Sequence, residues 1–167
     1  MSQINSFLDL DVYKDAFALQ QRIFELSKTW PAEERFSLTN QIRRSSRSIG
    51  ANLAEAWAKR RYPAHFLSKL TDSDGERQET EHWICTVEAC QYEPQPVIKE
   101  LREAITGIGK RLGRMIEAHE SFCLCVHEPA DSSYPTSDSR SPTADLRSPT
   151  SDLRSQTSDL RSQTSDH

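Results

Sequence analysis

Residues 38 to 62, LTNQIRRSSRSIGANLAEAWAKRRY, concentrate basic side chains in a chain whose net charge is −4. The six cations of its two clusters are Arg43, Arg44, Arg47, Lys59, Arg60 and Arg61, and the single acid of the segment is Glu55. Guanidinium and ammonium groups bind phosphate oxygens by charge-assisted hydrogen bonds. These side chains are therefore candidate contacts to the phosphates of a nucleic acid.

A second interpretation of the same cations is internal pairing. From residue 72 to residue 103 the charge balance reverses, with nine Asp or Glu against three Arg or Lys. Two helices of opposite charge that face one another would explain both segments. Exposed ion pairs stabilise a fold by only about 0–1 kcal/mol each, so this arrangement carries little energy. Both interpretations stay open at this point.

Two patterns contain metal-ligating side chains. Glu79-Thr-Glu-His82 has the Glu-x-x-His spacing of di-iron helix bundles, but the chain has no second copy to complete such a site. The ligand types for zinc near the end of the apolar sequence are His119, Cys123, Cys125 and His127. Their Cys-x-Cys spacing differs from the usual Cys-x₂-Cys knuckle. We predict no metal site.

Catalytic and cofactor motifs are absent from the sequence. There is no Gly-x-Ser-x-Gly elbow, no convincing Cys/His pairing and no glycine-rich phosphate loop. Trp57 and Trp83 could stack on bases, but both fall on or near apolar stripes, which predicts core packing. Cys85 and Cys90 are predicted to be small core residues. The sequence predicts no enzymatic activity and no cofactor.

The elements that position these residues are helices. Apolar residues recur every three or four positions over about residues 11–30, 38–57, 66–90 and 97–116, which predicts four amphipathic helices. Pro31, Tyr62-Pro63 and the prolines at 94 and 96 separate them, and the Asp72–Gly75 segment weakens the third. No segment alternates with period two. The prediction is an all-α, antiparallel up-and-down four-helix bundle.

The second helix carries two further features. At about 100° per residue, Arg43, Arg47 and Arg61 form one ridge beside its core stripe. Small side chains occupy the side opposite the core; they are Ala51, Ala54 and Ala58. A solvated helix face would normally carry Lys, Glu or Gln there. This alanine face predicts close approach of another subunit, and hence a homo-oligomer.

The chain divides by composition into residues 1–128, the four-helix bundle, and residues 129–167, a low-complexity heptapeptide-repeat tail. Units such as SPTSDLR hold too little apolar surface to offset the ordering entropy, so the tail is predicted to be disordered. The N-terminus has no secretory leader pattern, and no apolar run is long enough to span a bilayer. We expect a cytoplasmic protein without membrane contact and with reduced thiols.

Three runs carry a family resemblance: FLDLDVYKDAFAL, SLTNQIRRSSRSIGANLAEAWAKRRY and FLSKLTDSDGERQETEHWI. They resemble the four-helix-bundle proteins first noticed as reading frames inside intervening sequences of bacterial large-subunit ribosomal RNA genes, over about residues 7 to 122. The resemblance implies a bundle that assembles into a ring, a homopentamer in the best-understood branch. That branch is the accessory variability determinant of diversity-generating retroelements, a basic barrel that binds nucleic acid and a reverse transcriptase.

This chain departs from the retroelement branch in two respects. Its overall charge is acidic, and residues 90–93 read Cys-Gln-Tyr-Glu where that branch has a glycine. Reverse-transcriptase binding is therefore not carried over, and Arg43, Arg44 and Arg47 are the residues that match the family's basic motif. The sequence supports the hypothesis of a non-enzymatic oligomer that binds RNA or DNA through phosphates. The alternative is a structural or protein-binding scaffold with internally paired arginines.

Overall fold

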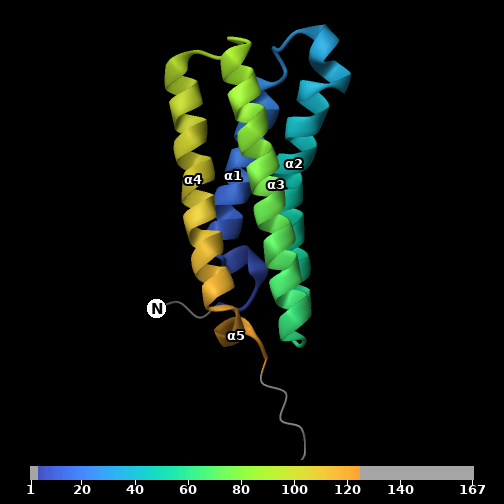
Figure 1. The fold of residues 1–167 in the computed structure, drawn as a ribbon, viewed down its shortest axis with the longest axis vertical. Helices are drawn as coiled ribbons and strands as arrows, with labels where there is room; N and C mark the ends of the chain where they lie inside the picture. The colour runs from blue at the N-terminus through green and yellow to red at the C-terminus, as the bar shows by residue number, and fades with distance from the viewer. Residues whose placement is uncertain (1–3, 125–167) are drawn as a thin grey trace, which may run out of the picture. The chain divides into compact units, whose positions relative to one another are not determined.

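The computed structural model describes residues 4–124, in which four long helices lie side by side (Figure 1). They are α1 (Asp11–Leu26), α2 (Leu38–Ala58), α3 (Pro63–Ala89) and α4 (Gln95–Glu117). The 3₁₀ turns η1 (Phe7–Asp9) and η2 (Ala32–Phe36) precede α1 and α2, and the short α5 (His119–Phe122) follows α4. Residues 4–124 form no strand. The predicted all-α four-helix bundle is confirmed.

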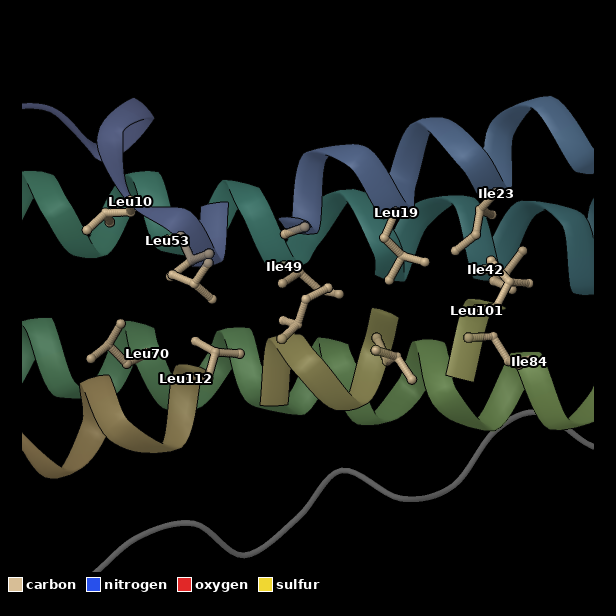
Figure 2. Close-up of a cluster of buried hydrophobic side chains, with 14 of the residues drawn as sticks. Leu10, Leu19, Ile23, Ile42, Ile49, Leu53, Leu70, Ile84, Leu101 and Leu112 are labelled. Carbon is tan, nitrogen blue, oxygen red and sulfur yellow. The ribbon is translucent and has the colours of Figure 1, made fainter. Parts of the chain in front are cut away.

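The helices run up and down in chain order, and α4 closes the bundle by packing against α1 as well as α3 (Figure 1). Every helix turns apolar side chains inward. Figure 2 shows several of them, among them Leu19, Ile23, Ile42, Ile49, Leu70, Ile84, Leu101 and Leu112, all of them buried. Burial of these side chains supplies the main favourable free energy of folding. Between residues 4 and 124, no helix has the length and apolar character needed to cross a membrane.

The first helix is shorter than its apolar pattern predicts. It ends at Leu26, and Trp30 lies in the connection that follows, still only 8% exposed. The hydroxyl groups of Ser27 and Thr29 donate to the carbonyl oxygens of Phe24 and Leu26, at 3.1 and 2.9 Å. Such local bonds compete with helix continuation. Trp30 therefore packs on the core from outside the helix.

The third helix is continuous through Asp72–Gly75. Its buried stripe passes from Leu70 through Ser73 and Thr80 to Ile84, so hydroxyl groups stand where an apolar pattern expects aliphatic side chains, and the half-buried Arg77 lies between them. The predicted burial of two cysteines is wrong: Cys85 and Cys90 are exposed. Position 85 follows the buried stripe by one residue and turns outward, and position 90 is the C-cap.

Small polar side chains join α2 to α3. The hydroxyl oxygens of Ser45 and Thr80 lie 2.9 Å apart, and the Ser73 hydroxyl donates to the carbonyl of Ile49 at 2.9 Å. All three hydroxyl side chains are fully buried. We call this contact the hydroxyl seam. Because each of these hydroxyl groups has a hydrogen-bond partner, their burial does not carry the cost of an unpaired polar group.

The C-terminus of α3 contains a strained residue. Gln91 has φ = 57°, in the left-handed region. Its N–H donates to the carbonyl of Glu88 at 3.0 Å, and the N–H of Tyr92 donates to that of Val87 at 3.1 Å. These are the two bonds of a Schellman motif, whose left-handed position usually holds glycine. The chain thus keeps the motif geometry where the glycine is missing.

Replacing Gln91 with glycine is expected to raise the free energy of unfolding by up to about 1 kcal/mol, because the left-handed conformation costs a side-chain-bearing residue more than glycine. Urea denaturation followed by circular dichroism measures the change. The matched control is Gln78→Gly in the middle of α3, where the backbone is helical and glycine is expected to cost about 1 kcal/mol. A loss of stability in both variants would contradict the prediction.

Candidate nucleic-acid interface

The side of α2 that faces away from the core is hollowed and basic. A shallow depression of about 490 Å³ is lined by Asn40, Arg43, Arg44, Arg47, Ser48 and Ala51. We call it the arginine groove. Its lining residues are spaced by three or four along the helix and therefore share one face. The helix places the three arginines of the family motif around one depression.

Arg43 and Arg47 reach from α2 towards α1. The Nε of Arg43 donates to the Ser27 hydroxyl at 2.7 Å. Both guanidinium groups lie over the Phe24 ring, at 4.9 Å for Arg43 and 5.5 Å for Arg47 from its centroid. Among residues 4–124, no carboxylate forms an ion pair with either side chain. Neither guanidinium group is therefore neutralised by an ion pair within residues 4–124.

Arg43 lies close to other positive charges. Partial burial, and then the like charges of Arg47 and Arg35, lower the pKa of the Arg43 guanidinium from its ordinary value. The guanidinium group stays charged, since an arginine remains protonated at neutral pH. Its charged form nevertheless lies in an unfavourable field that an anion would relieve.

Arg44 points the other way, towards α3. Its Nη2 donates to Oε1 of Glu79 at 2.8 Å, and the same oxygen accepts from the Trp83 indole at 3.2 Å. Burial, followed by the nearby charge of Glu79, raises the pKa of Glu76, and Arg44 acts in the opposite direction. Arg44 is thus the cation of the groove that has an internal partner, as the pairing interpretation predicts for some of them.

The second cluster of cations lies elsewhere. Lys59, Arg60 and Arg61 follow the end of α2 at Ala58, about 18 Å along the axis from Arg47. Arg60 stacks on the Trp57 ring at 3.3 Å and donates to the Trp57 carbonyl at 2.9 Å. The prediction that Arg61 continues the ridge of Arg43 and Arg47 is wrong, because the helix has already ended.

Two contributors to the basic surface come from outside α2. Lys28, two residues beyond the end of α1, lies 4.7 Å from the centroid of the Phe24 ring and also pairs with Glu25 at 2.7 Å. Arg35 of η2 is near enough to Arg43 for its charge to act there. The sequence pattern of α2 does not indicate either residue, because both come near the arginines of α2 only through the packing of α1 and η2 on that helix.

The remaining candidates of the sequence are placed as follows. Trp57 and Trp83 are half-buried and pack against the core. Ala51 and Ala58 are exposed and Ala54 is half-buried, on the outward side of α2. Within the described residues, no group of three or more His, Cys, Asp or Glu could hold a metal ion. Cys125 and His127, and the repeat tail, lie outside the described residues.

Comparison with known proteins gives the family. The family model of the 23S rRNA-intervening sequence protein matches residues 8–114, which include all of α1, α2 and α3 and most of α4. The chain belongs to this family. No curated protein matches the chain.

A solved structure is similar to this intervening sequence protein. It is a crystal structure of a protein of unknown function from the S23 ribosomal protein family of Bacteroides thetaiotaomicron, with a TM-score of 0.58 and 31% sequence identity. The match covers 64% of this chain and 95% of that chain. The family match and the similar structure support the helical fold and do not assign an activity.

Proposed function

We propose that this intervening sequence protein is a non-enzymatic, cytoplasmic homo-oligomer that binds nucleic acid through phosphate contacts in the arginine groove. The observation that carries the proposal is the crowding of Arg43 and Arg47, with Arg35 nearby, without carboxylate partners in residues 4–124. A phosphodiester backbone supplies negative charges in a row and neutralises such a surface. Binding of this kind does not depend on base sequence.

The small side chains on the C-terminal half of the outward face of α2 support the proposed oligomer. Ala51 is the last lining residue of the arginine groove, and α2 continues with Ala54 and Ala58 on its outward side; the small side chains of all three let a second helix approach closely. An assembly through this alanine face would repeat the arginine groove once per subunit. Several weak phosphate contacts per subunit would then add along one nucleic acid.

The experiment is an alanine series at Arg43, Arg44 and Arg47, with binding to generic single- and double-stranded nucleic acid measured at several salt concentrations. Each of Arg43→Ala and Arg47→Ala is expected to weaken binding about equally across sequences and to lower the salt slope by about one. The matched control is Arg22→Ala, which removes the same charge from the α1–α4 side, where Arg22 pairs with Glu100 at 2.9 Å. The control is expected to leave the slope unchanged.

The second candidate function is a structural or protein-binding scaffold, which the ion pair between Arg44 and Glu79 favours. For a scaffold, alanine substitution changes thermal stability and not binding. Wild-type protein without measurable affinity for nucleic acid at low salt would refute the phosphate proposal and leave the scaffold as the better account. Arg43→Ala and Arg44→Ala are the variants of the series for which we expect a measurable change in melting, because they remove the hydrogen bond to Ser27 and the ion pair with Glu79.

A further inference from the structure

Phe36 is an exposed aromatic side chain at the end of η2. Its exposed fraction is 84%, whereas the other exposed large apolar side chains of residues 4–124 range from 45% to 58%. Its ring therefore contributes almost nothing to the core. Single exposed apolar residues are ordinary on protein surfaces. Phe36 differs from an ordinary one in how it is held and in what lies beside it.

The turn that carries Phe36 is fixed by a hydrogen-bonded carboxylate. Glu34 accepts from the Ser37 hydroxyl, from the Leu38 N–H at 3.3 Å and from the Tyr92 hydroxyl at 3.1 Å. The bond from Ser37 and then the other two lower the pKa of Glu34. These bonds tie η2 to the start of α2 and to the α3–α4 connection. The ring is thus presented on an ordered turn, and binding to it has less conformational entropy to overcome.

The cation beside Phe36 is Arg35, in a turn that also holds the carboxylates of Glu33 and Glu34. Arg35, the preceding residue, acts on the charge of Arg43, as described above. Figure 1 shows η2 at one end of the bundle, above the first turn of α2. From Leu38 the helix rises about 8 Å to Arg43 and one further turn to Arg47. Along the axis of α2, Phe36 therefore lies within the span of a few nucleotides from these two arginines.

We infer that Phe36 stacks on an unpaired base and that the nucleic acid bound in the arginine groove is single-stranded. The inference rests on the proposed function and adds the class of partner. Stacking of a base on an aromatic ring contributes about 1–3 kcal/mol and tolerates every base. In a duplex the base faces are already stacked on one another, so no base face is free to stack on the Phe36 ring. Arginines alone do not make this distinction, because both forms carry phosphates.

The test uses the full chain and three probes of equal length: a mixed-sequence single strand, the same backbone without bases, and the corresponding duplex. Phe36→Ala is expected to weaken binding to the single strand by about 5- to 150-fold, the equivalent of one stacked base. It is expected to leave binding to the abasic strand and the duplex unchanged. Phe36→Trp is expected to retain single-strand binding. DNA and RNA versions of the single strand show whether the sugar matters.

Arg47→Ala is the contrasting variant, expected to weaken binding to all three probes and to lower each salt slope by about one. If Phe36→Ala leaves single-strand binding unchanged, or weakens all three probes alike, the inference is wrong while the proposed function stands. If wild-type protein binds none of the probes at low salt, the proposed function has failed instead. Phe36 would then be assigned to a protein partner, since exposed aromatic anchors also serve protein interfaces.

Discussion

Replacing Phe66 with alanine is expected to lower the free energy of unfolding by about 3–5 kcal/mol. Phe66 has no exposed surface and is the largest of the fully buried side chains. Its ring lies 6.3 Å, centroid to centroid, from the Phe122 ring of α5. Truncation removes the buried apolar surface and leaves a cavity that the close-packed helices fill only in part. Chemical and thermal denaturation of the full chain measure the loss.

The matched control makes the same substitution at the exposed phenylalanine. Phe36→Ala is expected to change the free energy of unfolding by no more than about 0.5 kcal/mol, since its ring makes little contact with the core. This control also establishes that the variant used for the binding test is folded. Equal destabilisation at Phe66 and Phe36 would contradict the described packing.

The second large effect concerns assembly. Ala51→Arg is expected to convert the proposed oligomer into helical monomers, because a long charged side chain on the alanine face both obstructs the approach of a second helix and leaves a charge unpaired at the interface. Light scattering measures the mass, and circular dichroism shows whether the monomer keeps its helices. In a monomer the same substitution would fall on an exposed position and change little.

Ala89→Arg is the matched control for assembly, because Ala89 is an exposed alanine in the last turn of α3, where a cation is favourable. It is expected to leave the mass unchanged. A wild-type protein that is monomeric at micromolar concentration would remove the basis for the oligomer. Dissociation by both substitutions would show that the alanine face has no special role.

The fold was predictable where the buried stripe is apolar. Leu38, Ile42, Ile49 and Leu53 indicate α2 with correct spacing, and the structure starts that helix at Leu38. The middle of α3 was harder to predict because its inward positions include Ser73 and Thr80. Both hydroxyl groups have a partner on α2, the Ile49 carbonyl for Ser73 and the Ser45 hydroxyl for Thr80, and a partner on another helix leaves no trace in the local pattern.

The clustering of the three arginines was predictable from the sequence, but the partner that each of them contacts was not. The motif places Arg43, Arg44 and Arg47 on one helix, and the structure brings them around one groove. Which arginine is paired depends on Glu79 of α3, and which ones lie over a ring depends on Phe24 of α1. These partners are set by tertiary packing, so the sequence favoured phosphate contact but left internal pairing open.

The two ends of the described chain share one end of the bundle. η1 and α5 lie at the lower ends of the helices in Figure 1, where the N–H of Leu124 donates to the carbonyl of Arg60 at 3.1 Å, and η2 with Phe36 lies at the other end. The 21 residues of α2 separate these ends by about 30 Å. A dye or an affinity handle attached within η1 or at Leu124 would therefore lie far from η2 and Phe36. Protein immobilised through either of these positions would display Phe36 at the far end of the bundle, away from the surface.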